Sequence, residues 1–335
     1  MSGSQKTALI FGISGQDGAY LAKLLLEKGY NVVGTSRDAE QASLTNLREL
    51  DVLQHIAVRS AVPFDFRSVV QVVKSADPCE IYNLAAQSSV GLSFDQPAET
   101  LQSMMNGTLN ILEAIRMLKS DAKFYNASSS ECFGSTIRAP ADEKTAFNPC
   151  SPYGVGKAAA HWLVANYRDA YGLHACSGIL FNHESPMRPA RFVTQKVIRG
   201  ALDIAEGKAK RLQLGNLAVR RDWGWAPEYV EAMWLMMQTE VPQDFVVATG
   251  IETSLEDFVA SAFSNCGLDW RAHVDIEPSL HRPSDIAYSV GNPALVRERL
   301  GWEAKCRMPE LTHRLVEAEV ARRSRSPNRA NSSDV

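Results

Sequence analysis

The stretch that most limits what this chain can fold into is a short, mostly apolar run followed at once by three regularly spaced glycines. The run covers residues 7–11, the glycines are Gly12, Gly15 and Gly18, and residues 19–29 have the apolar spacing of a helix. A strand, a glycine turn and a helix in this order open a dinucleotide-binding unit. The glycines let the backbone approach a pyrophosphate, whose charge the helix N-terminus favours. We therefore expect this turn to bind a dinucleotide through Gly12, Ser14, Gly15, Gln16, Asp17 and Gly18.

The end of the second expected strand indicates which dinucleotide is bound. An NAD enzyme usually has an acidic residue there, which binds the ribose hydroxyls. This chain has Ser36 and then Arg37, and a guanidinium suits a 2′-phosphate. We therefore expect NADP rather than NAD. Asp38 leaves an alternative open, since it could pair with Arg37 or bind the ribose itself.

Strand and helix patterns alternate over the first half of the chain. Such alternation is typical of a parallel sheet with helices on both faces. We predict an α/β fold, with a Rossmann-type doubly wound parallel sheet and a smaller C-terminal α/β domain. After the first strand, strands are expected at residues 31–36, 80–86, 123–127 and 173–180, a third strand before residue 64, and helices at 68–74 and 100–119.

The alternation fails beyond Pro186, which indicates a second domain. We assign residues 1–183 to an NADP-binding domain, to which the chain is expected to return at about 216–250, and residues 184–323 mainly to a substrate-binding domain. Further helices are expected at 193–206, 254–266, 293–300 and 309–323, and a strand at 245–248. The polar tail, residues 324–335, is expected to be disordered.

Several expected strands end in residues suited to a site. In an open parallel sheet, ligands bind beyond the carboxyl ends of the strands. Asp65 follows the third strand and is expected near the adenine, and Leu84 and Ala85 form a turn that a cofactor can approach. The fifth strand leads into Ser129 and Glu131. These two are candidate catalytic residues, with a serine-capped turn as the simpler alternative.

Tyr153 and Lys157 stand four residues apart, a spacing that puts two side chains on one face of a helix. An ammonium group a few ångströms from a phenol favours the phenolate and lowers a pKa that is ordinarily about 10. Such a pair can exchange protons with substrate at a hydroxyl or carbonyl carbon. Alone, this spacing usually marks an ordinary amphipathic helix. Beside the glycine turn and the serine-rich strand end, it predicts a catalytic pair.

Composition excludes several other classes of protein. The net charge of −3 over 335 residues gives no electrostatic reason to expect nucleic acid or an anionic membrane as a partner, and no apolar run reaches the roughly 18 residues of a membrane span. The six cysteines have no paired spacing, which argues against a disulfide framework and a metal site. We expect a cytoplasmic protein without metal.

Longer strings of residues carry a family resemblance over nearly the whole chain. The glycine turn, the serine-rich strand end and the Tyr153–Lys157 pair together resemble extended short-chain dehydrogenases/reductases that act on nucleotide sugars. Within that superfamily the chain is similar to the GDP-mannose 4,6-dehydratase family. The strings that carry this closer resemblance are residues 12–20, 180–186, 192–194 and 221–224.

The resemblance implies roles for matched positions. It implies that Ser129, Glu131, Tyr153 and Lys157 are the catalytic set, with Ser129 where many members have threonine. It places His183 and Arg188 at the cofactor, and Ser88, Asn182, Val193, Lys196, Arg221 and Arg282 at a GDP-sugar. It also implies a homodimer or homotetramer. The chain departs from many members at Arg37-Asp38, Phe64 and Asp285, where they have Arg-Arg, a glycine and a glutamate.

The implied reaction converts GDP-mannose to GDP-4-dehydro-6-deoxymannose and water, with NADP reduced and reoxidised in each cycle. A GDP-4-keto-6-deoxymannose reductase or another nucleotide-sugar epimerase or dehydratase is the nearest alternative, because it shares the tyrosine, the lysine and the glycine turn. A catalytically silent NADP-binding scaffold is a more distant alternative, which the complete catalytic set disfavours. The strings at 180–186 and 221–224 favour the dehydratase.

Overall fold

The structure is a computed structural model that describes residues 5–136, 139–280 and 284–325. Its centre is a seven-stranded sheet with the order β11-β6-β5-β4-β1-β2-β3, in which all neighbouring strands are parallel. The expected Rossmann-type doubly wound sheet is therefore confirmed. The strands are β1 (Thr7–Phe11), β2 (Asn31–Ser36), β3 (Ile56–Ser60), β4 (Glu80–Asn83), β5 (Lys123–Ser129), β6 (Ala175–Leu180) and β11 (Phe245–Val247).

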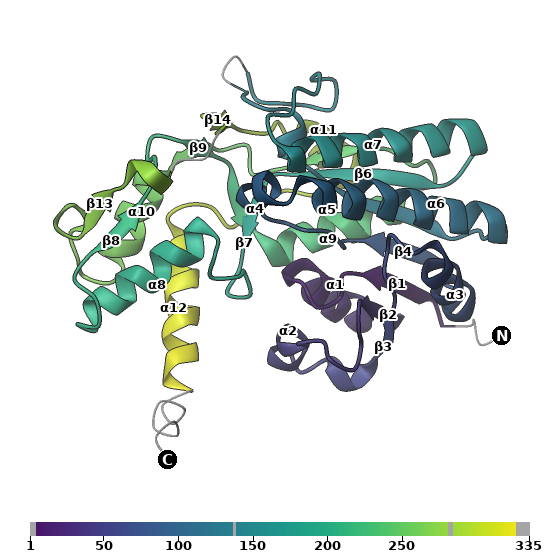
Figure 1. The fold of residues 1–335 in the computed structure, drawn as a ribbon, viewed down its shortest axis with the longest axis horizontal. Coiled ribbons are helices and arrows are strands. Elements are labelled where there is room, and N and C mark those ends of the chain that lie inside the picture. The colour runs from purple at the N-terminus through teal and green to yellow at the C-terminus, as the bar shows by residue number, and fades with distance from the viewer. Residues whose placement is uncertain (1–4, 137–138, 281–283, 326–335) are drawn as a thin grey trace.

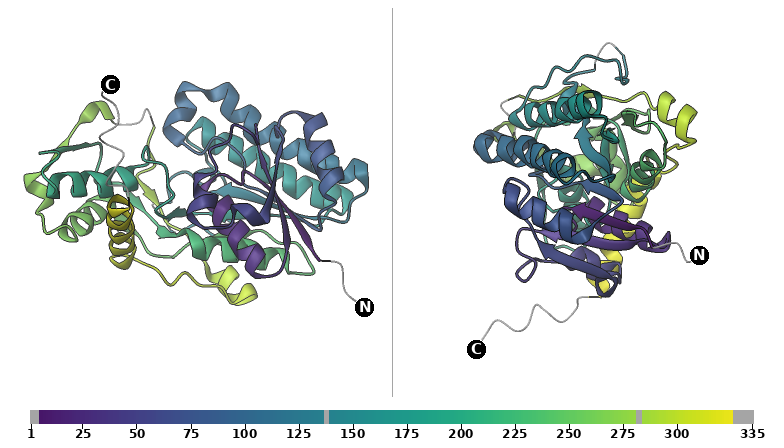
Figure 2. Two further views of the ribbon diagram at one scale, coloured as in Figure 1. Left: turned by 90° about the horizontal axis from the view of Figure 1, so that it is seen from below. Right: turned by 90° about the vertical axis from the view of Figure 1, so that its right-hand side faces the viewer.

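Helices cover both faces of this sheet (Figures 1 and 2). One face packs against α3 (Phe66–Ala76), α6 (Gly107–Leu118) and α7 (Pro152–Tyr171), and the other against α1 (Gln16–Glu27), α9 (Ala226–Met237) and α11 (Ala294–Leu300). The patterns did not predict α9 as a helix. Its sequence is apolar on almost every side, with Tyr229, Met233 and Met236 buried, so it lacks the one-sided stripe that marks an amphipathic helix.

The order of the strands reverses between β1 and β4, and a glycine turn lies at this point. Gly12 follows β1 with φ +88°, and a Cβ added to it would lie 2.8 Å from the carbonyl carbon of Leu84. A Cβ on Gly18 would lie 2.3 Å from the carbonyl oxygen of Gly12. Larger residues would therefore separate β1, α1 and the turn after β4, where ligands of doubly wound sheets bind.

The helix expected at residues 100–119 is interrupted. It consists of α5 (Pro97–Leu101), one π-helical turn (Gln102–Asn106) and α6. The π-turn packs against α7 at Gly156, where an added Cβ would lie 2.9 Å from Met104 Sδ. Such single turns widen a helix locally and are often found near functional sites. Short helices α2 (Thr45–Glu49) and α4 (Val90–Asp95) complete this half.

A second core lies beside the main sheet, to the left in Figure 1. It is built from α8 (Val193–Ala205), α10 (Leu255–Ser264), α12 (Glu310–Ser324) and the parallel pair β8 (Leu212–Leu214) and β13 (Val274–Ile276). Two small sheets join the halves: β7 (Asn182–Glu184) with β10 (Trp223–Trp225), and β9 (Arg220–Arg221) with β12 (Thr253–Ser254) and β14 (Tyr288–Ser289).

The prediction that residues 324–335 form a disordered tail was wrong for Ser324, which is the last residue of α12. Residues 326–335 lie outside the described residues.

Candidate active site

A cleft of about 500 Å³ lies at the carboxyl ends of the central strands, with one wall from the second core. Thirteen of the side chains predicted from the sequence line it, and they come from segments far apart along the chain, from Asp17 to Arg221. They are Asp17, Leu84, Ser88, Ser129, Glu131, Tyr153, Lys157, Asn182, His183, Arg188, Val193, Lys196 and Arg221. The fold therefore brings the predicted catalytic and substrate-binding residues into one space.

The first turn of α7 approaches the end of β5 closely. Ser151 caps α7 by accepting a hydrogen bond of 3.0 Å from Gly154 N, and Pro152 is the first helical residue. A Cβ added to Gly154 would lie 2.8 Å from the carbonyl oxygen of Glu131. A glycine at this position therefore lets Tyr153 lie beside Ser129 and Glu131.

Tyr153 and Lys157 share one face of α7, as predicted, but their electrostatics differ from the expectation. Burial raises the pKa of Tyr153, and a hydrogen bond with Ser129 partly opposes the rise. Lys157 Nζ donates to the carbonyl oxygen of Ala127 at 2.7 Å and lies 5.8 Å from the centroid of the Tyr153 ring. Burial lowers the pKa of Lys157 to about 8. The pKa of Tyr153 is therefore raised rather than lowered as expected, because desolvation is the largest cause of the shift and the groups that oppose it are Ser129 and Arg188, not Lys157.

An ion pair joins the first turn of α1 to β7. His183 Nε2 lies 3.0 Å from Asp17 Oδ2, and Gln16 Nε2 donates to the carbonyl oxygen of His183 at 3.2 Å. Ser185 Oγ donates to Gln16 Oε1 at 2.7 Å. The ring of His183 also stacks on Tyr229, with centroids 4.6 Å apart. These contacts fix the N-terminal turn of α1 against β7, the strand that leads into the second core.

A buried carboxylate connects the same strand to α8. Glu184 Oε2 accepts a hydrogen bond of 2.6 Å from Thr194 Oγ1 and lies 3.3 Å from Arg188 Nε. Glu184 is 2% exposed and also lines the cleft. The negative charge lies at the N-terminal turn of α8, where the helix dipole favours it.

The cleft wall from the second core contains a second ion pair. Arg221 Nη2 lies 3.1 Å from Asp285 Oδ1. The next residue, Asp222, is 1% exposed and accepts hydrogen bonds from Thr249 and from Gly250 N, each 2.7–2.9 Å long. Burial raises the pKa of Asp222 to about 6, although these hydrogen bonds favour the ionised carboxylate and lower the pKa. Asp222 thus ties the Arg221 strand to the end of β11, a role that the string 221–224 alone did not reveal.

The predicted dinucleotide residues fit a cofactor, although several do not line the cleft itself. No side chain caps α1 at Gly15, so its first amides are available to an anion. Asn46 Nδ2 holds the turn by donating to the carbonyl oxygen of Ser14 at 3.0 Å. Predicted residues that do not line the cleft are Gly12, Ser14, Gly15, Gln16, Gly18, Arg37, Asp65 and Ala85.

Arg37 and Asp65, predicted for the adenine side, lie outside the cleft. Asp65 is exposed and caps α3, with Oδ1 accepting from Arg67 N at 3.1 Å. Asp38 Oδ1 accepts from the amides of Glu40 and Gln41, and within the described residues no ion pair joins it to Arg37. Asp38 is thus engaged in its own turn, which leaves the guanidinium of Arg37 available to a ligand. Arg282 lies outside the described residues.

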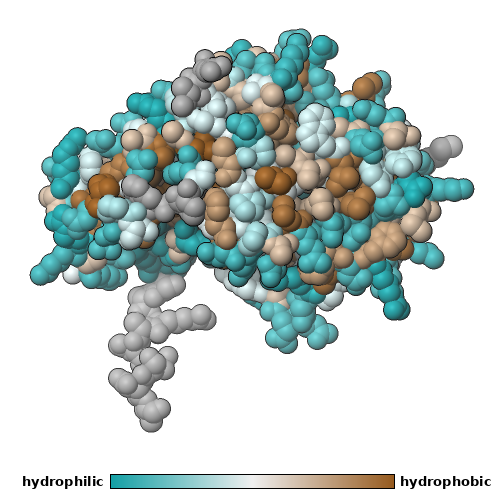
Figure 3. Space-filling model, turned by 45° about the horizontal axis from the view of Figure 1, so that its top comes forward, coloured by the Kyte–Doolittle hydropathy of each residue, from teal (hydrophilic) through white to brown (hydrophobic). Residues whose placement is uncertain are grey.

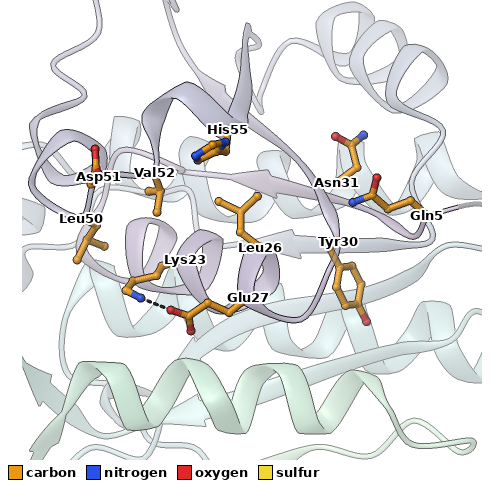
Figure 4. Close-up of a pocket in the computed structure, with 10 residues that line it drawn as sticks. All are labelled: Gln5, Lys23, Leu26, Glu27, Tyr30, Asn31, Leu50, Asp51, Val52 and His55. Atoms are coloured by element: carbon orange, nitrogen blue, oxygen red, sulfur yellow. Dashed lines mark hydrogen bonds and ion pairs between the residues drawn. The ribbon is translucent and has the colours of Figure 1, made fainter.

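A second hollow, of about 600 Å³, lies at the opposite end of the sheet (Figure 4). Gln5 and Asn31 at its rim stand at the start of β1 and β2, and its charged side chains Lys23 and Glu27 pair with each other. It is wide open and brings together no catalytic set.

Over the described residues, no group of His, Cys, Asp and Glu is arranged to hold a metal ion, and no helix has the length and apolarity needed to cross a membrane.

Comparison with known proteins gives a consistent picture at the sequence level. Residues 9–315 match the model of the family described as GDP-mannose 4,6 dehydratase. GDP-mannose 4,6 dehydratase 1 of Arabidopsis thaliana is 42% identical over 329 residues, which cover 94% of this chain and 90% of the relative. GDP-mannose 4,6-dehydratase of Sinorhizobium fredii is 40% identical over 341 residues, which cover 95% of this chain and 97% of the relative.

Solved structures share the fold at lower sequence identity. UDP-glucose 4-epimerase of Thermus thermophilus, in complex with NAD, superposes with a TM-score of 0.83 at 23% identity and covers 93% of this chain and 98% of its own. dTDP-glucose 4,6-dehydratase of Bacillus anthracis, also with NAD, has a TM-score of 0.83 at 18% identity and covers 95% of this chain and 98% of its own. At these identities the likeness establishes the architecture alone.

Proposed function

Because the chain belongs to the GDP-mannose 4,6-dehydratase family, we propose that it converts GDP-α-D-mannose to GDP-4-dehydro-6-deoxy-D-mannose and water. It is accordingly a hydro-lyase of nucleotide-sugar metabolism that uses the machinery of an oxidoreductase. The observation that carries the proposal is the family match over residues 9–315, together with Ser129, Glu131, Tyr153 and Lys157 lining one cleft.

Tyr153 is the group that takes the proton of the sugar's C4 hydroxyl. A bound nicotinamide would accept a hydride from C4 and return it to C6. Ser129, which is 8% exposed and interacts with Tyr153, hydrogen-bonds the developing C4 oxygen, a form of electrostatic stabilisation. Lys157 lies one turn further along α7 and holds the cofactor ribose.

Glu131 is the base for the elimination step. A ketone at C4 acidifies the proton at C5, Glu131 removes that proton, and the C6 hydroxyl leaves as water. A proton returns to C5 when the hydride reaches C6, so no net oxidation occurs. Glu131 and Tyr153 enter the cleft from different elements, the turn after β5 and the first turn of α7, which supports separate roles for the two groups.

We propose NADP as the cofactor, bound at the α1 turn with Arg37 at the 2′-phosphate. An exposed guanidinium after β2 and an aspartate that is engaged in its own turn support this choice. Asp65, Leu84, Ala85, His183 and Arg188 are assigned to the same cofactor. Ser88, Asn182, Val193, Lys196, Arg221 and Arg282 are assigned to the GDP-sugar.

We also propose that the protein forms a homodimer or a homotetramer. One exposed apolar surface supports self-association: Val155 and Trp162, seven residues apart on α7, are 46% and 61% exposed, and Met105 in the neighbouring π-turn is 40% exposed. Figure 3 shows hydrophobic groups among hydrophilic ones on this side of the molecule. Sedimentation of the wild type against Trp162→Glu tests this assignment.

Incubation with GDP-mannose alone tests the proposed function. A dehydratase makes a 4-keto-6-deoxy product without added reductant, which mass spectrometry and deuterium incorporation at C5 detect. A reductase or epimerase makes no such product, and a silent scaffold leaves the sugar unchanged. Intact GDP-mannose after incubation with cofactor-loaded protein would overturn the proposal.

A further inference from the structure

Glu184 is a buried acidic group of the cleft that has no part in the mechanism proposed above. It is 2% exposed, lines the cleft and ends β7, where it pairs with Trp225 of β10. Its Oε2 accepts a hydrogen bond of 2.6 Å from Thr194 Oγ1 and lies 3.3 Å from Arg188 Nε. Burying a carboxylate opposes folding even when a cation accompanies it. Stability alone therefore does not account for this group.

The guanidinium of Arg188 is held from several directions. Glu184 lies at its Nε edge, the carbonyl oxygen of His183 accepts a hydrogen bond of 3.4 Å from Nη1, and the ring centroid of Phe192 lies 4.0 Å away. Nε is buried and donates to no acceptor among the described residues, so the carboxylate of Glu184 holds it by charge rather than by a hydrogen bond. Nη2 has no hydrogen bond to the described residues and can donate to a ligand. An arginine that is ordered in advance loses less freedom when that ligand binds.

The charge of Arg188 acts on the first turn of α1. Burial opposes ionisation of Asp17, but His183 and, to a smaller extent, Arg188 lower the pKa of this carboxyl to about 2. Asp17 lies in the turn whose first amides have no side-chain cap, and it lines the cleft together with Arg188. The guanidinium and the expected pyrophosphate-binding turn thus border the same space.

We propose that Glu184 is a positioning residue for the cofactor, which holds the Arg188 guanidinium where it can donate to an oxygen of the bound nicotinamide nucleotide. The inference rests on the proposed function, because it takes that nucleotide as a ligand of this cleft and Arg188 as one of its contacts. In this role Glu184 acts through Arg188 and does not itself bind a ligand. Simple charge repulsion predicts the opposite sign: a carboxylate near an anionic cofactor repels it, so its removal would tighten binding.

Fluorescence titration with NADPH tests this role through a double-mutant cycle. Glu184→Gln keeps the side-chain shape, and its amide oxygen can still accept from Thr194, but it loses the charge that holds Arg188. The variant should bind NADPH about tenfold more weakly, equivalent to about 1.4 kcal/mol, while GDP binding measured by calorimetry stays unchanged. Arg188→Gln should lose at least as much NADPH affinity. The double variant should lose no more than Arg188→Gln alone, because Glu184 acts only through that arginine.

Glu319→Gln is the matched control. Glu319 is also a buried glutamate, 4% exposed, but it pairs with Arg322 and Arg323 on α12, outside the cleft. This variant should keep wild-type affinity for NADPH, even where urea unfolding shows that both variants lose stability. If Glu184→Gln does not fold, Glu184→Asp is the second variant. It keeps the charge but withdraws it by one methylene group, and it should still weaken NADPH binding several-fold.

NADPH affinity at or above the wild-type value in Glu184→Gln, or in Glu184→Asp where that variant is used, would overturn the proposal. Losses that add in the double variant would show that Glu184 does not act through Arg188, and an equal loss of GDP binding would indicate a distorted cleft instead. The proposed function is judged separately: a wild type that binds NADPH and shows the coupling but does not convert GDP-mannose would contradict the dehydratase activity and leave the role of Glu184 standing. A wild type that binds no nicotinamide nucleotide would refute both.

Discussion

His183 Nε2 lies 3.0 Å from Asp17 Oδ2, while His183 Nδ1 lies 2.7 Å from the carbonyl oxygen of Phe181. Both partners are acceptors, so both ring nitrogens donate and the ring is an imidazolium facing a carboxylate. Other charged or titratable groups near the pair are Arg188, whose charge opposes protonation of the ring, and Tyr229, which stacks on it. This pair joins α1 to β7 across 166 positions of sequence.

The pair should make stability depend on pH at both ends of the range. Burial favours neutral forms, but the partner charges prevail: the pKa of Asp17 falls to about 2, and that of His183 rises above its usual value. The ionised Asp17 carboxylate stabilises the fold fully above about pH 4, and this stabilisation is lost as the pH falls through about 2. The charged His183 ring stabilises the fold fully below about pH 6.5, and this stabilisation is lost as the pH rises through its raised pKa. The free energy of unfolding of Asp17→Asn should therefore be roughly 3 kcal/mol below that of the wild type between about pH 4 and 6.5. This difference between the two proteins should become smaller outside that pH window. Urea unfolding of both proteins across pH measures the gap, and a constant difference would contradict the ion pair.

Tyr153→Phe should reduce turnover of GDP-mannose by about 10³-fold while the substrate still binds. The phenol is the proposed proton acceptor and has no assigned contact with the diphosphate. Steady-state kinetics and calorimetry on the same preparation separate turnover from binding. Turnover at the wild-type rate would remove Tyr153 from the mechanism.

Glu131→Gln should oxidise the sugar at C4 and then stall, because the variant keeps the shape of the side chain but loses the proton acceptor. Reduced cofactor should accumulate in a single-turnover absorbance trace near 340 nm. Exchange of the C5 proton with deuterated solvent should slow by about 10²-fold or more. If the variant still exchanges that proton and forms the 6-deoxy product at normal rates, another group is the base, with Glu184 and His183 as the next candidates at the neighbouring strand end.

The wild type should bind NADPH more tightly than NADH, and Arg37→Ala should remove most of that difference. Loss of one charge-assisted contact at an exposed site predicts an effect of about tenfold on NADPH and little on NADH. Fluorescence titration of both cofactors against both proteins measures it. Equal affinities in the wild type would refute the NADP assignment.

Gly154→Ala should lower activity more than stability. The added Cβ would lie 2.8 Å from the carbonyl oxygen of Glu131, so α7 must move away from the turn after β5 and take Tyr153 with it. A displacement of this kind can reduce turnover about 10²-fold. Asn166→Ala, an exposed substitution on the same helix, is the matched control. Full activity in Gly154→Ala would show that the close approach is not needed.

Patterns within short windows of sequence predicted much of this protein correctly. The glycine turn, the seven strands of the sheet and the helix that begins at Val193 were all expected from neighbouring residues. The proposed catalytic residues also form two local pairs, because Tyr153 and Lys157 share α7, and Ser129 ends β5 just before the turn that contains Glu131. The helix α9 was missed, since a segment buried on nearly all sides has no amphipathic period.

The sequence by itself determined the local elements, because backbone preferences and apolar spacing act over a few residues. Only the tertiary structure decided which distant groups meet: Asp17 with His183, Arg221 with Asp285, and Asp222 with Thr249. It also decided the charge states, since Tyr153 was expected to have a lowered pKa and burial raises it instead. The physical reason is that desolvation and charge pairing depend on everything within several ångströms, and most of those neighbours are far away along the chain.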